Sequence, residues 1–118
     1  NIKLAEKISL EQKKNNKNLK IFIQVNIGNE KQKNGIEVDQ LESFYKKCTN
    51  ELKLNIIGLM CLPPYNEKSS LYFSEMDELT KKLNLSELSM GMSNDYIEAV
   101  KNNSTFLRIG SKIFGKRN

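Results

Sequence analysis

Histidine and tryptophan are both absent from this chain of 118 residues. Histidine is the side chain that proteins use most often as a general base and as a metal ligand near neutral pH. Its absence means that the chain alone cannot form a Ser-His or Cys-His catalytic pair. We therefore expect no catalytic residue of this kind and no metal site.

Cysteine is nearly absent as well, with only Cys48 and Cys61. Two cysteines are too few for a disulfide framework, and their spacing matches no zinc motif. No apolar stretch approaches the length of a membrane span, and no signal segment opens the chain. The sequence therefore predicts reduced thiols, a cytoplasmic location and no membrane partner. The chain begins at Asn1 rather than methionine, which either processing or a missing upstream part explains.

Arginine is scarce: Arg108 and Arg117 are the only two, so lysine carries nearly all of the positive charge. The net charge is +5, and a basic balance can indicate nucleic-acid binding. The lysines, however, stand beside many asparagines, and no aromatic RNA-binding motif accompanies them. A run of charges is most often a solvated face, so we expect no nucleic-acid partner.

Four compact apolar runs predict buried strands, at residues 19–26, 54–60, 87–90 and 106–109. One helix is predicted before the first strand, at residues 1–12, and residues 27–36 are predicted to be a polar loop. Asp39 with Glu42 resembles a capping box, and Ser93 can cap the last helix. The later helices are marked by apolar residues three and four positions apart: Val38, Leu41, Tyr45, Cys48 and Leu52, then Tyr72, Met76, Leu79 and Leu83, then Tyr96, Ile97 and Val100 facing inward.

Helices thus alternate with near-continuous apolar strands, which is typical of an α/β fold with a parallel sheet covered by helices. Two arrangements fit this order, a doubly wound open sheet and a (β/α)8 barrel. A complete barrel needs eight strands and about 250 residues, so four strands make about half of one.

Function in parallel β/α folds gathers at the carboxyl ends of the strands. Two of these ends combine glycine with a serine hydroxyl, at Gly91 to Ser93 and at Gly110 with Ser111. Small residues let a ligand approach the backbone, and barrels often hold a phosphate after their last two strands. The alternative is that Ser93 is only a helix cap and Gly110 only a turn residue.

Arg108 stands near the end of the last apolar run, two residues before Gly110. A charged side chain there must face a ligand, a partner charge or solvent. The alternative to a ligand contact is a structural ion pair with a carboxylate of the barrel.

The sequence also resembles a known family. LSMGMSNDYIEAV (88–100) and STFLRIGSKIFGKR (104–117) closely resemble the end of the pyridoxal phosphate homeostasis proteins, the YggS/PROSC family. IQVNIGNEKQKNGI (23–36) and IIGLMCLPP (56–64) resemble two further blocks in the same order. The resemblance implies a single TIM barrel of PLP fold-type III, related to the N-terminal domain of alanine racemase, that binds pyridoxal 5'-phosphate (PLP) inside. Residues 1–118 are then expected to be the C-terminal half of the (β/α)8 barrel, a fragment of a longer protein.

The resemblance also implies roles for individual residues. Ser93, with Gly110 and Ser111 in a second loop, is expected to bind the phosphate, and Arg108 is expected to face the pyridine nitrogen. Met60, Met90 and Met92 fall near the pocket, and we take Met92 as a cofactor contact. Asn26 and Lys33 fall near the mouth of the site. The family's lysine that attaches PLP covalently lies on an early strand outside this chain, and Lys20 lies at the wrong end of its strand to replace it.

The resulting expectation is a PLP carrier and regulator without strong catalytic activity, monomeric when complete. An arginine at the pyridine nitrogen only donates, so the ring is a weaker electron sink than with a carboxylate. A PLP-dependent enzyme acting on amino acids, in the manner of a racemase, is the first alternative. A barrel that binds the phosphate of another ligand is the second.

Overall fold

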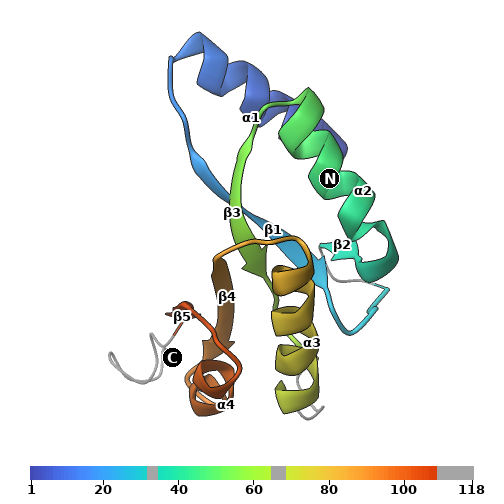
Figure 1. Ribbon diagram of the computed structural model, residues 1–118, viewed down its shortest axis with the longest axis vertical. Helices are drawn as coiled ribbons and strands as arrows, with labels where there is room; N and C mark the ends of the chain where they lie inside the picture. Colours follow the sequence, from blue (N-terminus) through green and yellow to red (C-terminus); the bar gives the residue numbers. More distant parts are fainter. Residues whose placement is uncertain (32–34, 65–68, 109–118) are drawn as a thin grey trace, which may run out of the picture.

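The computed structural model describes residues 1–31, 35–64 and 69–108, and Figure 1 shows its helices and strands. Helices and strands alternate along the chain. In order, they are α1 (Ile2–Lys14), β1 (Lys20–Asn26), β2 (Ile36–Glu37), a 3-10 turn (Val38–Gln40), α2 (Leu41–Lys46), a π-helical turn (Lys47–Glu51), β3 (Asn55–Met60), α3 (Ser69–Lys82), β4 (Glu87–Met92), α4 (Tyr96–Lys101) and β5 (Phe106–Arg108).

The strands form one five-stranded sheet in the order β2-β1-β3-β4-β5, and every pair is parallel. The four predicted strands are therefore confirmed as β1, β3, β4 and β5, although residue 109 lies outside the described residues. β2 was predicted as loop. It adds two residues beside the carboxyl end of β1, pairing Val25 with Ile36. Because all strands run the same way, their carboxyl ends meet at one edge of the sheet.

The two faces of the sheet differ in what covers them. Ile23, Leu59 and Leu88 are in register on neighbouring strands, and all three are buried. They share a single core with side chains from all four helices, so the helices cover this face; the helical members are Ala5, Leu41, Phe73, Met76 and Ala99. The next residues along the strands, Gln24, Met60 and Ser89, are also in register, and alternation points them to the opposite face. In a barrel, that opposite face is the interior.

Two expectations about the last helix are wrong. Ile97 and Val100 do not face inward, since their side chains are 56% and 53% exposed, whereas Ala99 is fully buried. Ser93 is not the cap either, because α4 begins at Tyr96 after the N-cap residue Asp95. The physical reason is the close approach of this helix to β4: only the small Ala99 fits against Gly91.

The expected capping box before α2 is not formed either. Asp39 lies inside the 3-10 turn, whose N-cap is Glu37, and α2 follows with Gln40 as its own N-cap. Neither Glu37 nor Gln40 makes a side-chain capping hydrogen bond. The chain enters this helix through a tighter turn, which moves the helix start past the Asp39 side chain.

Candidate functional site: the carboxyl ends of β4 and β5

Gly91 shapes the end of β4. Its φ is +106°, a left-handed conformation that side-chain-bearing residues rarely adopt. A Cβ at this position would lie 2.6 Å from the Cβ of Ala99 and 2.8 Å from Cδ2 of Leu107. The register between β4 and β5 shifts at the same point, between Ser89 and Met92. Glycine here therefore permits the irregularity in the strand two residues before Ser93.

A tight turn follows and joins β4 to α4. The backbone N–H of Asp95 donates to the carbonyl of Met92 at 3.2 Å. The backbone N–H of Met92 in turn donates to Oδ1 of Asp95 at 2.6 Å. Ser93 lies inside this doubly closed turn and is half-buried. The turn thus holds the Ser93 backbone at the carboxyl edge of the sheet, where the sequence predicted a phosphate contact.

Arg108 lies beside this turn, because β5 pairs with β4 so that Arg108 is opposite Met92. Met92 is 46% exposed, so its side chain stands at the surface beside Arg108 rather than in the core. Met90, by contrast, is buried in the helix-covered core. The structure therefore brings three of the predicted site residues together: Ser93, Met92 and Arg108.

The guanidinium of Arg108 reaches across the uncovered face of the sheet. Its Nη2 donates to Sδ of Met60 on β3 at 3.1 Å, and a thioether is a weak acceptor. The ion pairs within the described part of the chain do not include Arg108, so the structural ion pair considered as an alternative is not found there. The side chain is exposed and can donate to a ligand on this face.

Two aromatic rings border the same face. Phe22 of β1 and Phe106 of β5 meet edge to face, with ring centroids 5.2 Å apart and an interplanar angle of 81°. Phe106 is in register with Ser89, and Phe22 precedes Gln24 by two residues. The uncovered face therefore combines two aromatic rings with the cationic Arg108, a combination suited to a planar ring with a polar atom.

Asn26 ends β1 and is buried. Its Nδ2 donates to the carbonyl of Glu30 at 2.7 Å, and the N–H of Glu30 donates back to Oδ1 at 3.0 Å. These bonds fix the loop that follows β1 at the carboxyl edge of the sheet. Three other predicted site residues, Lys33, Gly110 and Ser111, lie outside the described residues.

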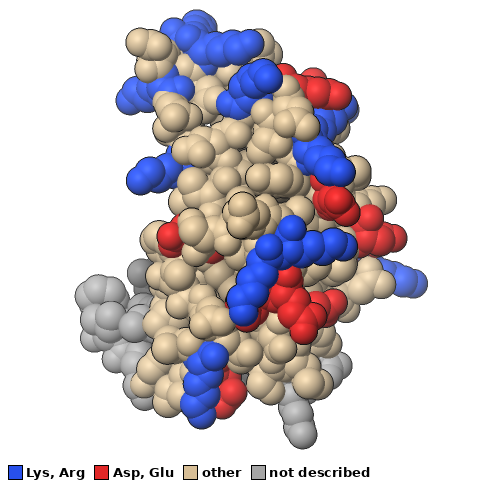
Figure 2. Space-filling view, in the orientation of Figure 1, with Lys and Arg blue, Asp and Glu red and all other residues tan. Residues whose placement is uncertain are grey.

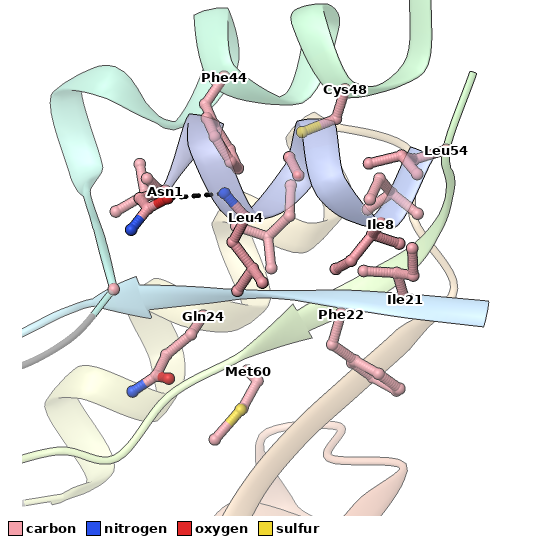
Figure 3. A pocket seen from close by; sticks show the side chains of 15 residues that line it. Asn1, Leu4, Ile8, Ile21, Phe22, Gln24, Phe44, Cys48, Leu54 and Met60 are labelled. Carbon is pink, nitrogen blue, oxygen red and sulfur yellow. Dashed lines mark hydrogen bonds between the residues drawn. The ribbon is translucent and has the colours of Figure 1, made fainter. Parts of the chain in front are cut away.

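A cavity lies elsewhere, between α1, β1 and the α2 region (Figure 3). It measures about 650 Å³, and apolar residues such as Leu4, Ile8 and Phe44 line it. It runs along the part of β1 that β2 does not pair with. Met60 and Phe22 connect the cavity with the candidate site, since both line the cavity while Met60 accepts from Arg108 and Phe22 packs against Phe106.

Both cysteines are free and buried. Burial raises the pKa of Cys48. Burial also raises the pKa of Cys61 to about 12, with a further contribution from the negative charge of Asp95. Neither thiol is therefore poised as a nucleophile near neutral pH. Across residues 1–31, 35–64 and 69–108, no three His, Cys, Asp or Glu side chains gather as a metal site.

The Cys61 thiol gives a testable pH dependence. An unfolded chain loses the thiol proton near pH 9, whereas the folded chain keeps it until about pH 12. Between these values the folded state binds more protons, so the free energy of unfolding falls as pH rises. Urea unfolding at several pH values should show a steeper fall for the wild type than for Cys61→Ala. If the free energy of unfolding fell equally with pH in both proteins, the raised pKa of Cys61 would be contradicted.

Surface charge on the face shown in Figure 2 is mixed. Lysine and arginine side chains are spread over its length, and acidic side chains lie among them. Some pair along single helices, as Lys46 does with Glu42 at 3.4 Å and Lys81 with Asp77 at 3.1 Å. None of the described helices has both the length and the apolar character needed to cross a membrane.

A parallel β/α sheet whose strands all end at one edge, with helices covering one face, is the architecture of part of a β/α barrel. Among such barrels, the chain belongs to the alanine racemase N-terminal domain family, whose sequence profile matches residues 1–118. The architecture is accordingly a partial barrel of the alanine racemase type.

Individual relatives are pyridoxal phosphate homeostasis proteins. The one from Aquifex aeolicus is 36% identical over 97% of this chain and 54% of its own length. The one from Homo sapiens is 37% identical over 98% of this chain and 48% of its own length. The chain thus spans about half the length of the curated relatives it matches.

Solved structures agree with the fold. PipY of Synechococcus elongatus without PLP superposes with a TM-score of 0.82 at 28% identity, over 95% of this chain and 57% of PipY. PipY with PLP bound gives a TM-score of 0.78 at 26% identity, over 95% of this chain and 56% of PipY. An unknown protein from Bifidobacterium adolescentis superposes with a TM-score of 0.87 at 26% identity, over 96% of this chain and 49% of the length of that protein.

Proposed function

We propose that this chain carries the phosphate and ring contacts of a PLP site in a protein of PLP homeostasis. The observation that carries the proposal is the pairing of β4 with β5, which sets the Ser93 turn beside an arginine that has no carboxylate partner in the described structure. The PLP-bound state of PipY and the names of the relatives support the same ligand. The donor set fits PLP, because a hydroxyl suits the phosphate and a cation suits the ring nitrogen.

Each predicted residue has a part in this proposal. The Ser93 hydroxyl donates to the phosphate, and Gly110 with Ser111 forms the second phosphate loop. Arg108 turns from Met60 to the pyridine nitrogen. Met92 packs beside the cofactor, while Asn26 and Lys33 border the mouth.

Arg108 favours a carrier over an enzyme only weakly, because the family resemblance implies that alanine racemases also place an arginine at the pyridine nitrogen. PLP supplies an electron sink for amino-acid chemistry, and the sink is strongest when the ring nitrogen is protonated. A guanidinium only donates, so it leaves that nitrogen unprotonated. We propose that the protein holds and delivers PLP without strong catalysis, as a cytoplasmic monomer with no nucleic-acid partner, and that residues 1–118 are one part of its barrel.

The experiment is a PLP titration of the complete gene product and its Ser93→Ala variant. Removing a hydrogen bond to a charged phosphate should weaken PLP binding about 10- to 100-fold. Ser43→Ala is the matched control, since that serine is exposed on α2 and donates only to the carbonyl of Gln40. Equal dissociation constants for wild type and Ser93→Ala would overturn the phosphate role.

Membership of the alanine racemase N-terminal family favours one second candidate, a PLP enzyme acting on amino acids. The two candidates differ in turnover. Chiral chromatography of L-alanine incubated with PLP-loaded protein should show no racemisation above the background of free PLP. A clear rate that depends on protein concentration would establish the enzyme and reject the carrier.

A further inference from the structure

Asp95 is the N-cap residue of α4, and its carboxylate joins two loops at the carboxyl edge of the sheet. Oδ1 accepts from the backbone N–H of Met92 at 2.6 Å, within the β4–α4 turn. Oδ2 accepts from Oγ of Ser69 at 3.2 Å, at the start of α3. One side chain therefore connects the turn that contains Ser93 with the helix that follows β3.

The electrostatics place the same carboxylate near the end of β3. The negative charge of Asp95 contributes to the raised pKa of Cys61, the residue directly after β3. Asp95 thus lies where the ends of β3 and β4 approach one another. Both carboxylate oxygens of Asp95 accept hydrogen bonds from the protein. A carboxylate that pointed directly at a phosphate would instead repel the negative charge of the phosphate.

We infer that Asp95 is a positioning residue for the anion-binding turn: its carboxylate locks the Met92–Asp95 segment to the start of α3 and so fixes the direction of the Ser93 hydroxyl. The inference rests on the proposed function, because it assigns Asp95 to the phosphate end of the same site. A hydrogen bond to a carboxylate is stronger than one between neutral groups, so the bonds of Asp95 stabilise this turn more than an ordinary turn hydrogen bond would.

The phosphate specificity of binding separates this role from a general structural one. We would measure the affinities of PLP and of pyridoxal, which lacks the phosphate, for the complete gene product and its variants. Asp95→Ala should weaken PLP binding about tenfold and pyridoxal binding less than about twofold. Asp95→Asn should stay within about threefold of wild type for PLP, because its Oδ1 still accepts from Met92.

Ser69→Ala provides the second variant and keeps the test decisive if Asp95→Ala does not fold. It removes only the contact to α3, and we expect a loss of about threefold in PLP affinity with pyridoxal unchanged. An unchanged ratio of PLP to pyridoxal affinity in these variants would overturn the role of Asp95 alone. A wild type that does not bind PLP would overturn the proposed function, and with it this inference.

Discussion

Gly91→Ala is expected to destabilise the protein by about 2–5 kcal/mol and to weaken PLP binding at least about tenfold. Holding alanine at a left-handed φ of +106° costs about 1–2 kcal/mol. The added methyl would lie 2.6 Å from the Cβ of Ala99, and relieving such overpacking costs about 1–3 kcal/mol more. Binding falls because the strand bend at Gly91 sets the direction of the next residues, Met92 and Ser93. Urea unfolding and PLP titration measure the two effects.

A double variant tests the steric half of this prediction. In Gly91→Ala with Ala99→Gly, the methyl that would collide is gone, while the backbone strain remains. The combined destabilisation should therefore be about 1 kcal/mol smaller than the sum of the two single effects. Strict additivity would show that the close approach of α4 to β4 is not what requires glycine.

Phe73→Ala is expected to lower the free energy of unfolding by about 3–5 kcal/mol, because Phe73 is fully buried in the core between α3 and the sheet. The total free energy of unfolding of a small domain is about 5–15 kcal/mol, so this single change removes much of the stability. Chemical denaturation of wild type and variant gives the difference directly.

The matched control is Leu71→Ala, two residues away on the same helix. Leu71 is 70% exposed, so its truncation should change the free energy of unfolding by less than about 0.5 kcal/mol. A similar loss in both variants would mean that α3 does not bury the face that contains Phe73.

The strands were predictable because their apolar residues are continuous. The strand that ends at Asn26 and the strand that ends at Met60 bury one whole face against helices. Such burial requires apolar residues close together in the sequence, so it can be recognised from a short segment alone. Which face of α4 is buried was not predictable in this way. Periodicity favoured the larger Ile97 and Val100, whereas the space beside Gly91 admits only Ala99, and that space depends on the tertiary approach of two elements.

The candidate site was predicted in part for a similar reason. Strand ends could be read from the sequence, and parallel pairing then brings Ser93 and Arg108 to one edge. Asp95 was missed, because its contact with Ser69 joins residues 26 positions apart and no local pattern encodes it. One signal was available: Asp95 directly precedes the first helical residue, a position at which aspartate commonly caps.

The most direct test of the central claim is a crystal structure of the complete gene product with PLP bound. We predict the phosphate within hydrogen-bond distance of the Ser93 hydroxyl, with the guanidinium of Arg108 turned from Met60 to the pyridine nitrogen. PLP bound instead in the apolar cavity between α1 and β1, or with its phosphate away from the β4–α4 turn, would contradict the account.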